Sequence, residues 1–302
     1  MAMTGVADSL LAESLERIAR EIDAAFDNLL PPPQDARRRL VEAMRYAAIG
    51  GGKRLRPLLL TSTAEMYGVD RNAAIRAAVA VESIHAYSLI HDDLPCMDDD
   101  GLRHGKPTVH RAFDEATAVL AGDALHAFAF ELLADPATSG DPFIRAELVQ
   151  TLGTASGFQG MAGGQMMDIA AETAPLDLQG VTRLQQLKTG ALLAAAVEMG
   201  AILGRVPQEG RIHLRGYARD IGLAFQIADD LLDHEGDEEA AGKALRKDAD
   251  AGKQTFVSLL GPGRAREQAN ILVEQAVSHL AHHGAEADVL RALARYIVER
   301  DR

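Results

Sequence analysis

The chain has 302 residues, of which 47% are hydrophobic and 25% charged, a balance typical of a globular protein able to bury a large core. Its formal net charge of −13 argues against nucleic acid as a partner. The single cysteine, Cys96, excludes an intramolecular disulfide and fits a reducing compartment. Residues 1–13 lack the features of a signal peptide, and we find no stretch of about 18 residues apolar enough to span a bilayer. We therefore expect a cytoplasmic protein without stable membrane insertion.

The hydrophobic pattern predicts helices along the chain and no convincing strands. Apolar residues spaced three or four apart from Leu11 to Leu29 predict a first helix that ends at Pro31. Further helices are predicted over about 35–49, 56–68, 71–93, 113–135, 143–171, 181–203, 209–235, 252–261, 264–284 and 287–300. No linker or change in composition divides the chain, so we expect an all-α fold of about ten or more helices in a single domain, residues 1–302.

Two aspartate clusters, residues 91–100 and 226–233, each follow an apolar helical run. Gathering carboxylates at the end of a buried helix is electrostatically costly unless cations neutralise them. Mg²⁺ is commonly held by a few carboxylates together with substrate phosphates. The glycine and glutamate positions of a calcium-binding EF-hand loop are missing. The two clusters therefore predict a shared Mg²⁺–diphosphate site.

The spacing within the second cluster suits a continuous helix, whereas that within the first does not. Residues four apart share a helix face, so Asp229 and Asp233 project together, with Gln226 about one turn earlier. Asp92 and Asp98 are six residues apart and would be splayed by a helix. Pro95, between them, predicts that the helix ends or loops there and lets Asp98 fold back toward Asp92. His85 and Ser88 precede Asp92 by two turns and one turn, and we expect His85 to face the same cavity.

Basic residues accompany the acidic clusters in two places, residues 53–56 and 103–106. The first follows three glycines and opens a helix, an arrangement in which backbone amides and the helix dipole favour a phosphate. The P-loop pattern is absent, which argues against nucleoside triphosphate chemistry. Taken alone, this segment is equally well explained as a helix boundary with a solubilising basic turn.

Residues 188–190, Lys-Thr-Gly, interrupt a helix otherwise made of leucine, alanine and valine. Such breaks in local propensity often mark functional positions. A kink at Gly190 would free the backbone carbonyls near Lys188 and Thr189 to face a cavity. A similar polar interruption at 163–168 is explained about as well by close helix packing.

In this order, the motifs make the chain resemble the trans-isoprenyl diphosphate synthases (polyprenyl synthetases), most closely the bacterial farnesyl diphosphate synthases. The matching segments are 51–57, 85–93, 188–190 and 225–233. The resemblance implies the isoprenoid-synthase fold, a helical bundle around a central cavity, in a homodimer. It also implies a Mg²⁺-dependent head-to-tail condensation of isopentenyl diphosphate with dimethylallyl or geranyl diphosphate, which yields farnesyl diphosphate and releases diphosphate.

The resemblance also implies roles for individual residues. About three Mg²⁺ ions would be held by the aspartates Asp92, Asp93, Asp98, Asp229, Asp230 and Asp233. Binding of the allylic diphosphate would involve Arg103, Lys188, Gln226 and Lys253. Binding of isopentenyl diphosphate would involve Lys53, Arg56, His85 and His104. The allylic cation would be shielded by the catalytic contacts Lys188, Thr189 and Gln226. The released diphosphate would remove the final proton.

One departure from the family pattern concerns His104, which stands where relatives usually carry a second arginine. Histidine is only partly charged at neutral pH and lacks arginine's bidentate fork. We therefore predict weaker or more pH-dependent binding of isopentenyl diphosphate, with activity retained.

Product length depends on what blocks the hydrocarbon tunnel below the first aspartate motif. Tyr87, five residues before Asp92, is bulky and is expected to point down that helix beside Ser88. Together with the four-residue spacer between Asp93 and Asp98, it favours a C15 product. A geranylgeranyl diphosphate synthase, with a C20 product, remains an alternative.

Two further alternatives are a class I terpene cyclase and a non-catalytic subunit of the same fold. The cyclases usually have a different second motif and an aromatic-rich cavity, whereas this chain has a second aspartate motif and only 4% aromatic residues. The intact aspartates and lysines of the motifs argue against a non-catalytic subunit.

Overall fold

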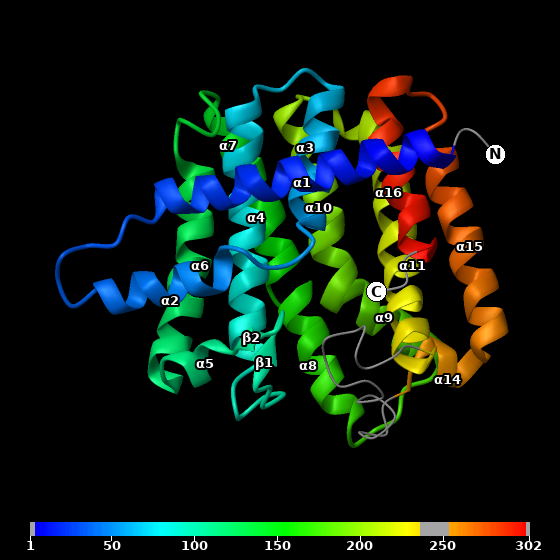
Figure 1. Cartoon of the computed structure of the whole chain (residues 1–302). Helices are drawn as coiled ribbons and strands as arrows, with labels where there is room; N and C mark the ends of the chain where they lie inside the picture. Colours follow the sequence, from blue (N-terminus) through cyan, green and yellow to red (C-terminus); the bar gives the residue numbers. More distant parts are fainter. Residues whose placement is uncertain (1–3, 236–253, 300–302) are drawn as a thin grey trace.

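The computed structural model describes residues 4–235 and 254–299. Lys253 and the charged segment 236–252, which the sequence suggests is a flap, lie outside the described residues. Figure 1 shows an all-α architecture, which confirms the predicted fold class. Its helices are α1 (Thr4–Leu29), α2 (Arg38–Ala48), α3 (Leu55–Met66), α4 (Arg71–Asp92), α5 (Val109–Ala112), α6 (Glu115–Ala134), α7 (Pro142–Ser156), α8 (Met161–Ala171), α9 (Leu178–Gln185), η1 (Gln186–Gly190), α10 (Ala191–Leu203), η2 (Gln208–Arg211), α11 (Ile212–Glu235), α14 (Phe256–Leu260), α15 (Pro262–His279), η3 (Ala285–Ala287) and α16 (Asp288–Glu299). A minimal hairpin joins β1 (Leu102–Arg103) to β2 (Lys106–Pro107).

Helix α4 lies at the centre of the bundle. It packs against α3, α6 and α10, while α1 crosses the bundle and contacts α3, α4 and α16 (Figure 1). Its small residues are buried on several sides, as expected for a helix that neighbours approach closely. The ends of α4 and α11 that carry aspartates lie at the same end of the bundle (Figure 1). This arrangement brings the two acidic clusters to one region of the molecule.

The expectation that no stretch is apolar enough to span a bilayer is wrong. Among the described residues, three helical stretches have the length and composition to do so: Arg71–Asp92, Glu115–Ala134 and Leu178–Leu203. The first is the central helix α4. Its apolar residues belong to the core, since 61% of its most apolar window is buried inside the fold. The second is only 39% buried and leaves apolar side chains exposed on α6.

The single helix predicted over residues 143–171 is also wrong, because the chain breaks between α7 and α8. Residues 157–160 form this break, with glycine at both ends. A Cβ atom on Gly160 would lie 2.1 Å from the carbonyl oxygen of Ala155, so no other residue fits without movement. The apolar periodicity continues through this segment and therefore predicted one helix. The turn depends instead on the close approach of Gly160 to the backbone of Ala155.

Candidate active site

The first aspartate motif turns back on itself where α4 ends. Asp92 is the last helical residue and Asp93 is the C-cap. The Asp98 amide donates a hydrogen bond to the Asp92 carbonyl over 2.9 Å. The predicted return of Asp98 toward Asp92 is therefore confirmed at the backbone.

Asp92 occupies an electrostatically unfavourable position. The pKa of its half-buried carboxyl is raised to about 6, chiefly because burial penalises the charged form. Lys188 and Arg103 counteract this shift, while Asp98 and Asp93 add to it by repulsion. Further positive charge near Asp92 would therefore be stabilising, and this fits a divalent cation.

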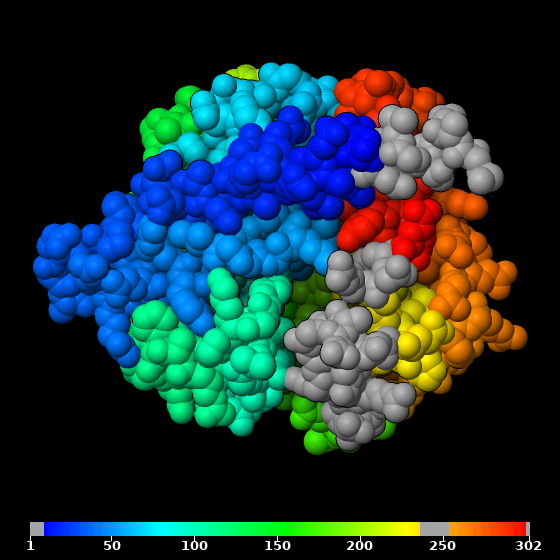
Figure 2. All heavy atoms as spheres, viewed as in Figure 1, coloured from blue at the N-terminus to red at the C-terminus, as the bar shows by residue number. Residues whose placement is uncertain are grey.

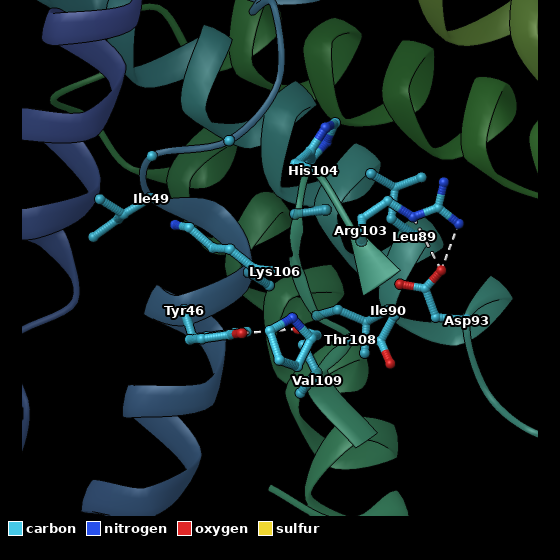
Figure 3. A pocket seen from close by; sticks show the side chains of 15 residues that line it. Tyr46, Ile49, Leu89, Ile90, Asp93, Arg103, His104, Lys106, Thr108 and Val109 are labelled. Carbon is cyan, nitrogen blue, oxygen red and sulfur yellow. Dashed lines mark hydrogen bonds and ion pairs between the residues drawn. The ribbon is translucent and has the colours of Figure 1, made fainter. Parts of the chain in front are cut away.

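Asp93 is the buried aspartate of the first motif, and it binds Arg103. Its carboxyl is only 3% exposed, and the Nε atom of Arg103 donates to Oδ1 over 3.0 Å (Figure 3). Asp100 accepts from Nη2 of the same guanidinium, also over 3.0 Å. Burial raises the pKa of Asp93, and the hydrogen bond from Arg103 opposes the shift. The two carboxylates thus orient Arg103 beside Asp92.

The second aspartate motif lies on the uninterrupted helix α11, as predicted. Asp229 and Asp233 are half-buried and one turn apart, with Gln226 also half-buried. Asp230 is only 5% exposed, and its Oδ2 accepts a hydrogen bond of 2.8 Å from the Phe256 amide at the start of α14. Asp230 therefore ties α11 to α14, leaving Asp229 and Asp233 as the more accessible pair.

The interruption at Lys188 is a π-helical turn, η1, between α9 and α10. Such turns are frequent at functional sites and alter the regular helical hydrogen-bond pattern. Within η1, the Lys188 ammonium lies 2.7 Å from Oδ2 of Asp168 on α8. A Cβ atom on Gly164 would lie 2.2 Å from the Lys188 amide nitrogen. Segment 163–168 thus provides close helix packing, one of the two explanations left open from the sequence, and also an ionic partner for Lys188, which the sequence did not predict.

The glycine loop before α3 separates its cations into different environments. Arg54 has a φ of 53° and is only 4% exposed, so its guanidinium points into the fold. It donates to Glu82 over 2.7 Å and to Asp23 over 2.7 Å. Lys53 is exposed, whereas Arg56 is half-buried. Arg54 therefore anchors the loop, and the sequence alone gave no reason to separate it from its neighbours.

Arg56 lies between the glycine loop and the second aspartate motif. Burial lowers the pKa of its guanidinium, and the charges of Glu82 and Asp229 oppose this shift. Its Nε atom is buried and makes no hydrogen bond to any described residue. A buried guanidinium donor without an acceptor is costly, and an anionic ligand would satisfy it.

His85 and His104 complete a cationic region next to Arg56. The pKa of His85 lies well below its usual value because of burial and then the charges of Arg56, His104, Arg54 and Arg103. Burial likewise lowers the pKa of His104, followed by Arg103, Arg54 and Lys106, while Glu82 raises it. Both imidazoles are therefore mostly neutral at pH 7 in the absence of an anion. The charges that surround them favour a phosphate group here.

The β1–β2 hairpin places His104 over the glycine loop. His104 and Gly105 both have positive φ, 52° and 73°, the pattern of the two-residue turns that match strand twist. A Cβ atom on Gly51 would lie 3.4 Å from the His104 ring. The pocket in Figure 3 lies here, between the hairpin, the end of α4, and α2 with the loop after it. Figure 2 shows a hollow beside the hairpin segment.

Tyr87 packs against α6. Its ring meets those of His126 and His91 edge to face, with centroids 5.1 Å and 5.7 Å away, and His126 in turn meets Phe130. The neighbouring Ser88 donates its hydroxyl hydrogen to the His85 carbonyl over 2.9 Å, within the helix. Tyr87 thus belongs to an aromatic row between α4 and α6, and the hydroxyl of Ser88 has a local backbone partner.

In the described ranges, no three carboxylate, imidazole or thiol side chains converge on a metal position. Mg²⁺ is usually bound through one or two carboxylates with waters and substrate phosphates, so dispersed aspartates opposite a cationic region suit it. An all-α bundle with two aspartate walls and this cationic region defines the class of diphosphate-using isoprenoid synthases. The chain belongs to the polyprenyl synthetase family, whose model matches residues 37–296.

Individual relatives match along most of the chain. The farnesyl diphosphate synthase of Escherichia coli K12 is 43% identical over 297 residues, which cover 96% of this chain and 99% of the relative. A crystal structure of an FPP/GFPP synthase from Zymomonas mobilis is 57% identical with a TM-score of 0.88, and the match covers 96% of this chain and 99% of that one. The geranyltransferase of Helicobacter pylori, complexed with magnesium and isoprenyl diphosphate, is 33% identical with a TM-score of 0.82, covering 96% of each chain.

Proposed function

We propose that the protein is a Mg²⁺-dependent prenyltransferase that makes farnesyl diphosphate. It joins isopentenyl diphosphate head to tail with dimethylallyl diphosphate, and then with geranyl diphosphate, and releases diphosphate at each step. The observation that carries the proposal is the buried Nε of Arg56, which lacks an acceptor among the described residues and lies between a cationic loop and Asp229. The family and the full-length similarity to farnesyl diphosphate synthases support the same reaction.

The allylic diphosphate would bind between the two aspartate walls. Asp92, Asp98, Asp229 and Asp233 would hold about three Mg²⁺ ions together with phosphate oxygens. When bound, Mg²⁺ neutralises the charge that develops on the leaving diphosphate. The family resemblance groups Asp93 and Asp230 with these ligands, but their roles would be indirect. Asp93 would orient Arg103, and Asp230 would hold the Phe256 amide. Lys253, outside the described residues, remains a proposed diphosphate contact.

The reaction requires cleavage of the C1–O bond of the allylic substrate and attack by the double bond of isopentenyl diphosphate. Arg103 and Lys188 would stabilise the departing diphosphate. Gln226 and the carbonyls around Thr189 in the π-helical turn would shield the allylic carbocation. A new carbon–carbon bond then forms, and the released diphosphate accepts the proton lost from C2. These steps need no side-chain base.

Isopentenyl diphosphate would bind in the cationic region between the glycine loop and the hairpin. Lys53, Arg56, His85 and His104 would contact its diphosphate, and the glycines would allow backbone amides to approach. The phosphate would in turn raise the pKa of both imidazoles and favour their protonated forms. This binding mode assigns an acceptor to the buried Nε of Arg56.

The reaction is tested by incubating the purified protein with Mg²⁺, isopentenyl diphosphate and allylic substrates of increasing length, followed by chromatography and mass spectrometry. We expect a C15 diphosphate, one released diphosphate per condensation, and complete loss of turnover with chelator. Asp92→Asn should abolish turnover, while Asp99→Asn, a control in the same motif whose side chain pairs with Arg111, should retain it. Cyclised hydrocarbons would indicate a terpene cyclase, and no turnover would indicate a non-catalytic subunit.

We further propose that the protein is a cytoplasmic homodimer that uses the exposed face of α6. Val119 and Leu120 are 41% and 56% exposed on this helix, which is apolar enough that a protein partner would stabilise it. Light scattering after size-exclusion chromatography should give twice the chain mass. Leu120→Asp should yield monomers, whereas Ile212→Asp, at an equally exposed apolar position on α11, should not. A monomeric wild-type protein would contradict this assembly.

A further inference from the structure

Four histidines gather at the opposite end of α11 from the aspartate motif. His213 lies in the first turn of this helix, His279 ends α15, and His282 and His283 follow in the next loop. His213 precedes Asp229 by 16 residues, roughly 24 Å along a helix. Helices α11 and α15 lie side by side (Figure 1). The cluster is therefore separate from the proposed active site and takes no part in the reaction above.

Two of these imidazoles face each other through their Nδ1 atoms. The distance from Nδ1 of His213 to Nδ1 of His279 is 3.5 Å. Two imidazole nitrogens on one tetrahedral Zn²⁺ are separated by about 3.3–3.4 Å, given Zn–N bonds of about 2.0–2.1 Å. The His282 ring also lies near, with its centroid 5.5 Å from that of His213. The spacing of the pair thus matches that of two ligands of one ion.

A buried carboxylate lies next to His279. Asp220 is only 2% exposed, and its Oδ1 accepts from the Nε of Arg219 over 2.9 Å. Its other oxygen, Oδ2, has no well-formed hydrogen bond among the described residues and lies 3.3 Å from Nε2 of His279. A carboxylate oxygen at this distance would favour the tautomer of His279 with its proton on Nε2 and its lone pair on Nδ1, toward His213. This carboxylate–histidine arrangement is the usual support of metal-binding imidazoles.

The orientation of His279 is also fixed by its neighbour on α11. A Cβ atom on Gly216 would lie 2.4 Å from Cε1 of the His279 ring, so the ring rests directly against the helix backbone. It is held on one side by Gly216 and faces Asp220 through Nε2. A donor nitrogen oriented in advance loses little conformational freedom on binding an ion.

We propose that His213 and His279 form a site for a divalent transition-metal ion of the Zn²⁺ class, with Asp220 as the supporting carboxylate. Imidazole nitrogens suit Zn²⁺, Ni²⁺ and Cu²⁺, whereas Mg²⁺ prefers oxygen ligands. Since no group of three ligand side chains is present among the described residues, water completes the coordination of the ion. The bound ion would link α11, which carries the second aspartate motif, to α15.

The test is a competition titration of the tag-free, chelator-treated protein with Zn²⁺ and a chromophoric chelator, in excess Mg²⁺ to occupy the aspartate motifs. We expect the wild type to bind Zn²⁺ at this site and to unfold at a higher temperature when Zn²⁺ is present. His213→Ala and His279→Ala should each weaken binding at least about 10-fold and remove the thermal shift. Asp220→Asn should weaken it by about 10-fold, the usual effect of losing a supporting carboxylate.

The matched control is His283→Ala. His283 is adjacent to the cluster in sequence, but its ring lies against Tyr67, with centroids 6.1 Å apart. This variant should bind Zn²⁺ as the wild type does. His213 is exposed, so His213→Ala is expected to fold normally, and its circular dichroism spectrum verifies this. Zn²⁺ binding by a folded His213→Ala protein with wild-type affinity would overturn the proposal.

Discussion

The ammonium of Lys188 lies 2.7 Å from the carboxylate of Asp168, and this ion pair joins the π-helical turn to α8. The side chains of Lys188 and Asp168 are only 28% and 15% exposed. Lys188 also counteracts the raised pKa of Asp92 on α4. One cation therefore connects three segments that are far apart in the sequence. Asp168 is best described as a positioning residue for Lys188.

Replacing Asp168 tests this role. Asp168→Asn keeps the shape of the side chain but removes the charge that orients Lys188, so kcat/KM should fall about 10-fold, or ~1.4 kcal/mol of transition-state stabilisation. Lys188→Ala should lose about 100-fold or more, because it removes a cation at the departing diphosphate. The double variant should be no slower than Lys188→Ala alone, since residues that act through one another are not additive. Additive losses in steady-state kinetics would show that Asp168 acts independently.

The buried pair of Arg54 and Glu82 should matter for stability. Both residues are less than 5% exposed, and one oxygen of Glu82 accepts from Arg54 over 2.7 Å. Glu82→Ala leaves a buried guanidinium short of one partner and should lower the free energy of unfolding by about 3–5 kcal/mol in urea denaturation. The control Arg38→Ala removes an exposed pair with Glu42 and should cost about 0.5 kcal/mol or less. Equal losses for the two variants would contradict this assignment.

Tyr87 is expected to limit product length. Tyr87→Ala removes the ring that packs against His126 and opens space along α4, so the product distribution should shift from C15 to C20 and longer. Mass spectrometry of the hydrolysed products measures the shift. Phe143→Ala, at an exposed position on α7, is the control and should leave the distribution unchanged. If Tyr87→Ala still makes only C15, the floor of the tunnel lies elsewhere.

His104 should make isopentenyl diphosphate binding depend on pH. Because burial and then Arg103 lower its pKa below the usual 6.5, His104 is mostly neutral at pH 7–8 and gains its charge only as the pH falls. The KM for isopentenyl diphosphate should therefore decrease from pH 8 toward pH 6. His104→Arg carries a permanent charge, so it should lower KM several-fold at pH 8 and flatten the profile.

The control for this experiment is His282→Arg, which adds the same charge in an exposed loop after α15. It should reproduce the wild-type profile. A KM that is the same for His104→Arg and the wild type across pH 6–8 would show that position 104 does not contact the substrate charge.

Local features of the sequence predicted most of the secondary structure and the local geometry of the aspartate motifs. Apolar periodicity predicted most of the helices, because a helix shows its buried face every three to four residues. The spacing of Asp229 and Asp233 placed them one turn apart, and Pro95 correctly predicted that Asp98 returns toward Asp92. Each of these inferences concerns residues within about two helical turns, where geometry follows directly from backbone sterics.

Close contacts between helices could not be predicted from local sequence patterns. The break at residues 157–160 depends on Gly160 lying against the backbone at Ala155, and apolar periodicity continued through it. The three helical stretches long and apolar enough to span a membrane were also not predicted, because charged residues inside them, such as Glu82, Asp123 and Lys188, interrupt their apolar runs. Burial of α4 depends on neighbours contributed by other parts of the chain.

By itself, the sequence determined the helical class, the family and the two aspartate motifs, because periodicity and motif spacing are local properties of the chain. Only the tertiary structure decided how neighbouring residues of the same type divide their roles. Arg54 is buried against Glu82 while Lys53 is exposed, and Asp230 bonds to the Phe256 amide while Asp229 remains more accessible. Adjacent side chains point in different directions, and the partner each one meets comes from a distant segment. Charge and burial at a site are therefore set by packing.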